Sequence, residues 1–268
     1  MDKPTMFKPY PAGPEIDVLP SYFPIPILGM VPINAFVLHA AEPVLVDTGL
    51  VLLSDEFMAA LSSIIDPGEL RWLWLTHTDP DHIGSLHRLL EEAPRLRVIT
   101  TFLALGKMSL FRPLPLERLY LLNPGQSLDV GDRTLTALRP PTYDAPETTG
   151  FYDPASAALF SADSFGALLT EPAASAAEIG PDDLRLGLRT WATVDSPWLH
   201  SLDPAKFTDT LNRLRNLAPT LILSSHLPAA QGMTDTLLDY LAETPAAPPF
   251  IGPDQPALEA LLAELAAR

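Results

Sequence analysis

The sequence predicts an α/β layered fold, and two observations support this prediction. Short apolar runs typical of strands alternate along the chain with segments whose apolar residues recur at helical spacing. The 268 residues, 47% of them hydrophobic, are also enough for one sizeable core. Strands separated by helices are typical of sheets covered by helices. We therefore expect residues 1–268 to form a single domain, with a Pro-rich N-terminal segment and a C-terminal helix.

The predicted strands are short apolar runs between turn-forming residues. Two of them, 34–38 and 44–47, form a predicted hairpin that ends in Asp47-Thr48-Gly49. The other predicted strands are 71–76, 96–101, 134–138, 157–162 and 220–225. The predicted helices are 54–65, 81–92, 206–217, 234–241 and 256–267. The Pro-rich stretches are predicted to be loose: 1–26, 138–146 and 244–256.

The charge balance and the absence of cysteine exclude several classes of function. With 17 Lys and Arg against 33 Asp and Glu, the formal net charge is −16, so a nucleic-acid surface is not expected. Without cysteine there are no disulfides, zinc–thiolate sites or cysteine-held iron–sulfur clusters. No stretch reaches the roughly 18 apolar residues that span a bilayer, and the N-terminus lacks an apolar signal core. We therefore expect a cytoplasmic protein with neither nucleic-acid nor membrane partners.

Several predicted strands end at, or just before, an aspartate or a histidine. These residues are Asp47, His77, Asp163 and His226. Active sites commonly lie at strand ends, on loops that a rigid sheet positions. If these strands share an edge, the four side chains converge.

The densest cluster of candidate ligands is Thr76-His77-Thr78-Asp79-Pro80-Asp81-His82, between a predicted strand and a predicted helix. Imidazole and carboxylate are the usual ligands of zinc, iron or manganese in sites without sulfur. His77 and Asp79 could serve one metal ion while Asp81 and His82 serve a second. The alternative is that Asp79 and Pro80 begin the helix, as N-cap and first helical residue, which leaves the two histidines unexplained.

This cluster resembles the H-x-[HED]-x-D-H signature of the metallo-β-lactamase fold superfamily. Three further segments match that superfamily in the same order along the chain: Val44-Leu45-Val46-Asp47-Thr48-Gly49, Phe160-Ser161-Ala162-Asp163 and Ser224-Ser225-His226. The resemblance implies a four-layer αββα sandwich with a dinuclear metal site. It also implies that Asp163 bridges the two ions and that Asp47 orients water or a ligand; the alternative for Asp47 is a turn residue before Gly49.

Within the superfamily, the sequence is most similar to the flavodiiron and oxygen-binding diiron proteins. Asp79 is an acid where zinc hydrolases usually have histidine, and Phe160–Gly166 resembles the flavodiiron segment around the bridging aspartate. The segment Asp144-Ala145-Pro146-Glu147-Thr148 resembles the branch's His-x-Pro-Asp-Ser segment. Here Asp144 stands where the family has a ligand histidine, with Tyr143 as the neighbouring candidate. Either Asp144 replaces the histidine as an oxygen ligand, or the first metal position is weakened or lost.

The resemblance therefore implies seven metal ligands and two catalytic residues. The catalytic residues are Asp81 and Asp47, and the metal ligands are His77, Asp79, Asp81, His82, Asp144, Asp163 and His226. The four negative charges of the carboxylates balance the charge of two divalent ions, and the three imidazoles are neutral as ligands. Such an oxygen-rich set favours iron, with zinc or manganese as the other options.

Three hypotheses for the function follow from this ligand set. The first is a diiron protein that binds or reduces dioxygen or nitric oxide. Because residues 229–268 are too short for a flavodoxin domain, it would need an external electron donor. The second is a metal-dependent hydrolase of a small ester, thioester, lactone or phosphodiester substrate. The third is a non-catalytic or single-metal descendant. A homodimer is possible by analogy with the family.

Overall fold

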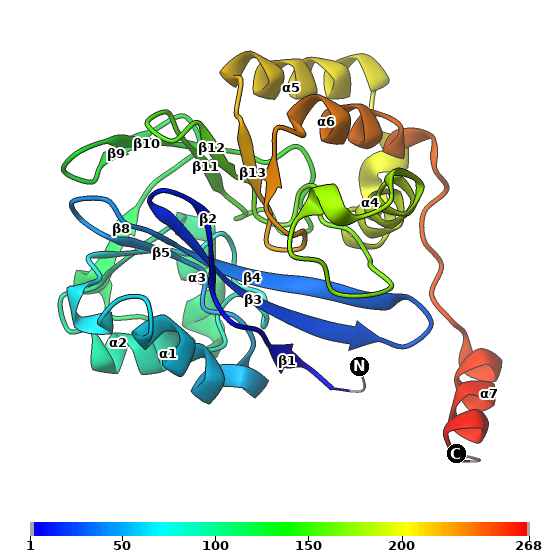
Figure 1. Cartoon of the computed structure of the whole chain (residues 1–268), viewed down its shortest axis with the longest axis horizontal. Coiled ribbons are helices and arrows are strands. Elements are labelled where there is room, and N and C mark those ends of the chain that lie inside the picture. Colours follow the sequence, from blue (N-terminus) through cyan, green and yellow to red (C-terminus); the bar gives the residue numbers. More distant parts are fainter. Residues whose placement is uncertain (1–2, 267–268) are drawn as a thin grey trace.

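The computed structural model describes residues 3–266 and contains two β-sheets packed face to face (Figure 1). In sheet order, the first sheet contains β1 (Thr5–Met6), β3 (Ile16–Ile25), β4 (Gly29–Leu38), β5 (Val44–Val46), β6 (Trp72–Trp74), β7 (Arg97–Thr100) and β8 (Leu119–Leu121), with β2 (Tyr10–Gly13) paired to β3. The second contains β14 (Ala230–Gln231), β13 (Leu221–Leu223), β12 (Ala158–Phe160), β11 (Gly150–Asp153), β10 (Thr134–Leu138) and β9 (Ser127–Asp129).

Helices cover the outer face of each sheet. The first sheet is covered by α1 (Ser54–Ser62), α2 (Leu86–Glu92) and α3 (Phe102–Phe111), and the second by α4 (Pro181–Asp195), α5 (Pro204–Leu217) and α6 (Thr234–Ala242). A central core, which includes Phe36, Trp74 and Phe160, fills the space between the sheets. This arrangement confirms the predicted four-layer αββα sandwich. Single 3₁₀ turns lie at Val51–Leu53, Pro67–Glu69, Leu116–Arg118, Ala176–Glu178, Pro197–Ser201 and Thr244–Ala246.

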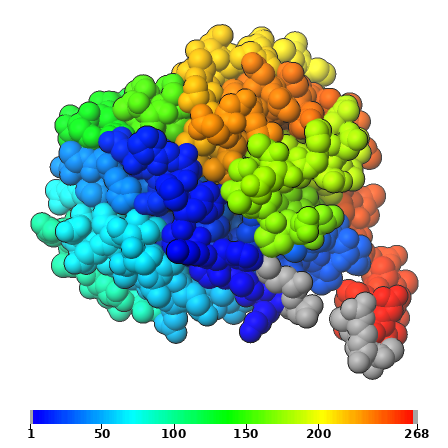
Figure 2. All heavy atoms as spheres, in the orientation of Figure 1, coloured from blue at the N-terminus to red at the C-terminus, as the bar shows by residue number. Residues whose placement is uncertain are grey.

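The two halves of the chain form the two halves of the sandwich. Figure 2 shows the first half, blue to cyan, packed along a broad boundary against the green-to-orange remainder. The last helix, α7 (Gln255–Ala266), lies apart from the sheets in Figure 1, and its described side chains are mostly exposed. The predicted end of this helix at Ala267 lies outside the described residues, as do Met1 and Asp2 of the Pro-rich segment. Within residues 3–266, no helix combines the length and apolar character needed to cross a bilayer.

Parallel strand pairs bring the predicted strand-end residues to common edges. In the first sheet β5, β6 and β7 are parallel, with Val46 opposite Trp74 and Trp74 opposite Ile99. In the second sheet β12 and β13 are parallel, with Phe160 opposite Leu223. The carboxyl ends of parallel strands meet at one edge of a sheet, so the loops that follow them lie side by side.

Two of the predicted segment assignments are wrong. The Pro-rich stretch 1–26, predicted to be loose, contains the ten-residue strand β3. Its Pro20 and Pro24 have no partner residue in β1 or β2, so their missing N–H groups break no pairing there. The predicted helix 81–92 begins only at Leu86, after the N-cap residue Ser85, so Asp79 and Pro80 do not start a helix. The predicted hairpin is confirmed, with Leu38 opposite Val44.

Candidate metal centre

The loop that follows β6 is held against the turn that follows β5. The backbone N–H and hydroxyl of Thr48 both donate to the carbonyl of His82, at 2.7 and 2.9 Å. Gly84 donates to the Gly49 carbonyl at 2.8 Å and packs so closely that a Cβ there would lie 2.2–2.3 Å from backbone atoms of residues 49–51. The loop from 77 to 84 therefore takes its shape from the Asp47-Thr48-Gly49 turn.

Asp47 fixes the orientation of His82. It is 1% exposed and adopts a φ of 57°, a left-handed conformation that Asp tolerates better than most residues. Its Oδ1 accepts the Thr76 N–H at 2.9 Å, and its Oδ2 accepts the Thr76 hydroxyl at 2.7 Å and His82 Nδ1 at 2.8 Å. Because Nδ1 donates to a carboxylate, His82 presents a bare Nε2 to the centre of the cluster.

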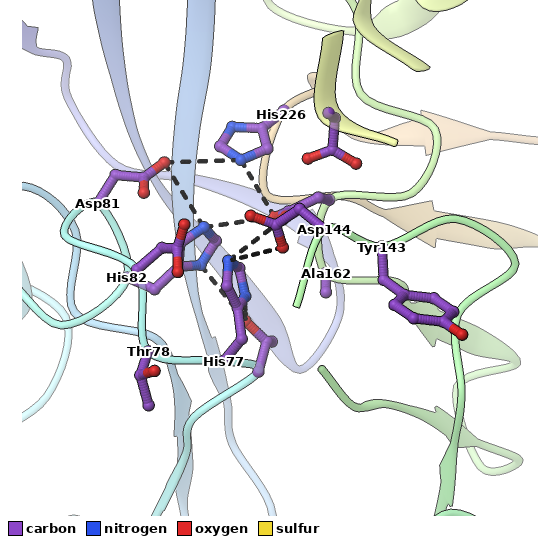
Figure 3. A network of polar contacts seen from close by, with 12 residues as sticks. His77, Thr78, Asp81, His82, Tyr143, Asp144, Ala162 and His226 are labelled. Atoms are coloured by element: carbon purple, nitrogen blue, oxygen red, sulfur yellow. Dashed lines mark hydrogen bonds and ion pairs between the residues drawn. The ribbon is translucent and has the colours of Figure 1, made fainter. Parts of the chain in front are cut away.

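One group of candidate ligands joins the loop after β6 to the loop before β11. Ligand atoms of His77, Asp79 and Asp144 lie within 4.8 Å of one another. His77 Nε2 lies 4.0 Å from Asp144 Oδ1 and 3.2 Å from Asp163 Oδ2. Figure 3 shows Asp144 pointing into this cluster and Tyr143 pointing away from it. The geometry thus favours Asp144 over its neighbour at the family's histidine position.

A second group joins the same loop to the end of β13. Ligand atoms of Asp81, His82 and His226 also lie within 4.8 Å of one another. Asp81 Oδ2 lies 3.5 Å from His82 Nε2 and 3.6 Å from His226 Nε2 (Figure 3). The Nδ1 of His226 donates to the Pro32 carbonyl at 2.8 Å, which leaves Nε2 free to face the cluster.

Asp163 lies between the two groups. Its Oδ2 faces His77, while its Oδ1 lies 3.3 Å from His82 Nε2 and 3.1 Å from His226 Nε2. The preceding residue, Ala162, has a φ of 50°, a strained conformation for alanine of the kind that clusters at functional sites. The structure therefore brings the other six predicted ligands together around the buried carboxylate of Asp163.

The buried polar atoms at the centre fit a pair of cations. Within the described residues, Asp163 Oδ1 and His82 Nε2 are buried with no hydrogen-bond partner, although they lie 3.3 Å apart. The cluster combines carboxylate oxygens with bare imidazole nitrogens, which is the donor set that iron, manganese and zinc accept. The histidines and Asp163 are at most 3% exposed, whereas the Asp79, Asp81 and Asp144 side chains are 27–37% exposed. Solvent therefore reaches the site from the side of these three aspartates.

The charged groups of the cluster shift one another's pKa values. Burial opposes charge on Asp163, but His77, His82 and His226 hold its pKa well below the usual range. Burial likewise opposes charge on His82, but Asp81, Asp47 and Asp163 raise its pKa well above the ordinary value. Burial, together with Asp163 and Asp79, raises the pKa of Asp144 to about 7. Bound cations would replace the protons that these groups otherwise share.

Two polar residues near the cluster were missed by the sequence analysis. Asp195, at the end of α4, places a carboxylate oxygen within 4.8 Å of those of Asp144 and Asp163. Lys107, on α3, lies 3.9 Å from Asp79 and pairs with the buried Glu147. The sequence offered one signal for Lys107, which is one of only four lysines in an acidic chain, and none for Asp195, because the helix that ends at it was not predicted.

The fold and this cluster agree with comparisons to known families. A family model described as "ODP family beta lactamase" matches residues 31–226. The chain belongs to this family. All seven predicted ligands lie within the matched range, and the resemblance to flavodiiron-type proteins is confirmed.

Curated relatives of this ODP-family chain are longer proteins. Diflavin flavoprotein A 1 of Synechocystis sp. is 33% identical over 134 residues, which is 50% of this chain and 23% of that protein. The anaerobic nitric oxide reductase flavorubredoxin of Salmonella typhi is 27% identical over 195 residues, which is 72% of this chain and 40% of that protein. The chain thus spans less than half the length of these relatives.

Solved structures share the fold. The rubredoxin oxygen:oxidoreductase of Desulfovibrio gigas matches with a TM-score of 0.77 and 20% identity, over 88% of this chain and 61% of that one. The flavodiiron protein of Giardia intestinalis matches with a TM-score of 0.77 and 16% identity, over 91% and 60%. At these identities the structural match establishes the fold alone.

Proposed function

We propose that this chain holds two iron ions in the cluster and reduces dioxygen or nitric oxide with electrons from a donor outside residues 1–268. The observation that carries the proposal is the position of Asp163, whose two oxygens face separate groups of ligands. Its relatives support the choice of reaction, since they include proteins named nitric oxide reductase, flavorubredoxin and rubredoxin oxygen:oxidoreductase.

The proposed ligands divide between two positions that share Asp163. The first position comprises His77, Asp79 and Asp144, and the second comprises Asp81, His82 and His226. Four carboxylates against three imidazoles favour iron over zinc, so the set supports a redox centre better than a zinc hydrolase. Two ferrous ions would supply electrons to a bound diatomic molecule, and the chain's own residues would hold the ions and control access.

The remaining residues of the site have roles that follow from their contacts. Asp81 would hold the second ion from the side that solvent reaches, where its side chain is 27% exposed, so it would lie beside a molecule that enters from solvent. Asp47 is a positioning residue that acts through His82, because within residues 3–266 its carboxylate accepts hydrogen bonds only from that imidazole and from Thr76. Trp191 donates its indole N–H to the Asp163 carbonyl at 3.1 Å and lies 4.4 Å from the His226 ring, so it screens that side of the site from water.

The proposal includes an external electron donor and, by family analogy, a homodimer. Reduction of dioxygen to water needs four electrons, and two ferrous ions that become ferric supply two. With no cysteine in the chain to hold an iron–sulfur or rubredoxin-type centre, residues 1–268 need a separate reductant for repeated turnover.

The experiment is to load the protein with Fe²⁺ without oxygen, and then to measure metal content and the consumption of dioxygen or nitric oxide with a chemical reductant. We expect about two irons per chain and turnover that stops in Asp163→Asn, which removes the shared charge. His39→Gln is the control, because His39 pairs with Asp17 outside the cluster. Iron-loaded protein that consumes neither gas, or zinc-loaded protein that hydrolyses esters instead, would contradict the proposal.

A further inference from the structure

Asp195 is a carboxylate at the cluster that belongs to none of the matching motifs. It is the last residue of α4, and one of its oxygens lies within 4.8 Å of oxygens of Asp144 and Asp163. Asp163 is 2% exposed, and its Oδ1 has no hydrogen-bond partner among the described residues. Three carboxylates thus converge on one point, and the buried one, Asp163, also has an oxygen without a hydrogen-bond partner on its side toward His82 and His226.

The surroundings of Asp195 disfavour a negative charge. Its Oδ2 accepts the Ser196 hydroxyl at 2.9 Å, but none of the ion pairs found in residues 3–266 includes it. It lies at a helix C-terminus, where the partial charge of the backbone is already negative. A cation between the three carboxylates would turn this unfavourable arrangement into a favourable one.

Asp195 also makes the two metal positions chemically unequal. Asp195 approaches only Asp144 and Asp163 of the first position, and counted there it would give that position one imidazole, His77, and four carboxylates. The second position has the imidazoles of His82 and His226 with two carboxylates. Oxygen-rich sites suit harder cations such as Mn²⁺, and imidazole suits Fe²⁺ and Zn²⁺.

We propose that Asp195 is an additional ligand at the first position, where it compensates for the aspartate at 144 and builds an oxygen-rich site that accepts a hard divalent cation such as Mn²⁺ in addition to Fe²⁺. This inference rests on the proposed dinuclear centre. Under this inference, the affinity of the ion at the first position depends on Asp144 and Asp195, and the affinity of the ion at the second position depends on His226.

The test is Mn²⁺ binding by metal-free protein, measured by equilibrium dialysis and electron paramagnetic resonance, in wild type and Asp195→Asn. We expect wild type to bind two Mn²⁺ per chain with the signal of a coupled pair. In Asp195→Asn, one binding step should weaken about tenfold or more while the other is unchanged, so that the six-line signal of isolated Mn²⁺ appears. The matched control is Asp182→Asn, an exposed acid in the first turn of the same helix.

The thermal midpoint of the metal-free proteins separates a ligand from a structural residue. A ligand role predicts that metal-free Asp195→Asn unfolds at the same temperature as wild type or higher, because a repelled carboxylate is removed. A lower metal-free midpoint with unchanged Mn²⁺ affinity would overturn the proposal and assign Asp195 to the fold. Two equally tight Mn²⁺ ions in both proteins would also overturn it and leave the dinuclear centre intact, whereas no Mn²⁺ bound to wild type would overturn the centre itself.

Discussion

The carboxylate of Asp47 offers a sharp perturbation of the site, because it contacts His82 and lies outside the proposed ligand set. In Asp47→Asn the side chain keeps its volume, but the amide nitrogen is a donor and cannot accept the His82 Nδ1 hydrogen. If the amide oxygen keeps the Thr76 N–H, which it now accepts at 2.9 Å, its nitrogen faces His82. The imidazole then favours the tautomer with its hydrogen on Nε2. A protonated Nε2 cannot bind a metal ion, and Nε2 is the nitrogen that faces the cluster.

The expected loss follows from the role of this contact. Removing the partner that orients a ligand histidine lowers metal affinity about 10–100-fold, or about 1.4–2.8 kcal/mol. With metal in excess over both dissociation constants, the stabilisation of the folded protein falls by the same amount. At about 2–4 °C per kcal/mol for a chain of this size, the metal-dependent rise in Tm should shrink by roughly 3–11 °C. Calorimetry with and without Co²⁺ measures that rise, and the visible spectrum of Co²⁺ reports the bound ion.

The matched control is Asp17→Asn. Asp17 also pairs with a histidine at 2.8 Å, but that partner is His39, outside the cluster. We expect the metal-dependent rise in Tm to be unchanged in this variant. If Asp47→Asn also keeps the full rise, or loses only metal-free stability, the orienting role of Asp47 is refuted and the residue serves the turn alone.

Three further perturbations test other parts of the account. In Gly84→Ala the new Cβ must displace the 49–51 backbone, so the free energy of unfolding in urea should fall by about 3 kcal/mol and metal affinity should fall with it. The control is Gly106→Ala on α3, where a Cβ meets open space, and we expect neither stability nor metal affinity to fall. In metal-free protein, Asp144 keeps its proton up to about pH 7 while the unfolded chain releases it near 3.9. The stability that this retained proton contributes is therefore lost as pH rises from about 4 to 7. Asp144→Asn should flatten that part of the Tm–pH curve. A variant curve that runs parallel to the wild-type curve would contradict the raised pKa of Asp144. Asp144→His should raise Zn²⁺ affinity at the first position about tenfold, and unchanged occupancy would count against a ligand at 144.

The sequence predicts the cluster well where ligands sit at the ends of recognisable strands. An apolar run of three or more residues comes shortly before each of Asp47, His77, Asp163 and His226. These runs become two pairs of adjacent parallel strands, β5 with β6 in the first sheet and β12 with β13 in the second. Strand ends are set by backbone pairing, so a short pattern is enough to place them. Which side chains share a proton or a cation depends on distances that no local pattern contains.

The missed elements have physical reasons. The helices α3 and α4, which the sequence did not predict, contain the interior glycines Gly106 and Gly187, which lower helix propensity. Gly187 is required by packing, since a Cβ there would lie 2.3 Å from the Leu168 carbonyl oxygen. Asp195 and Lys107 lie on these two helices, so their approach to the cluster could not be predicted without the fold.

The direct measurement of the central claim is anomalous diffraction at the iron edge from crystals of protein loaded with Fe²⁺ without oxygen. We predict two anomalous peaks per chain, about 3.5–4 Å apart, with one oxygen of Asp163 at each and Asp144 beside the peak nearest His77. A single peak beside His226, with none beside His77, would show that the first position is lost. No peak at either position would contradict the dinuclear centre.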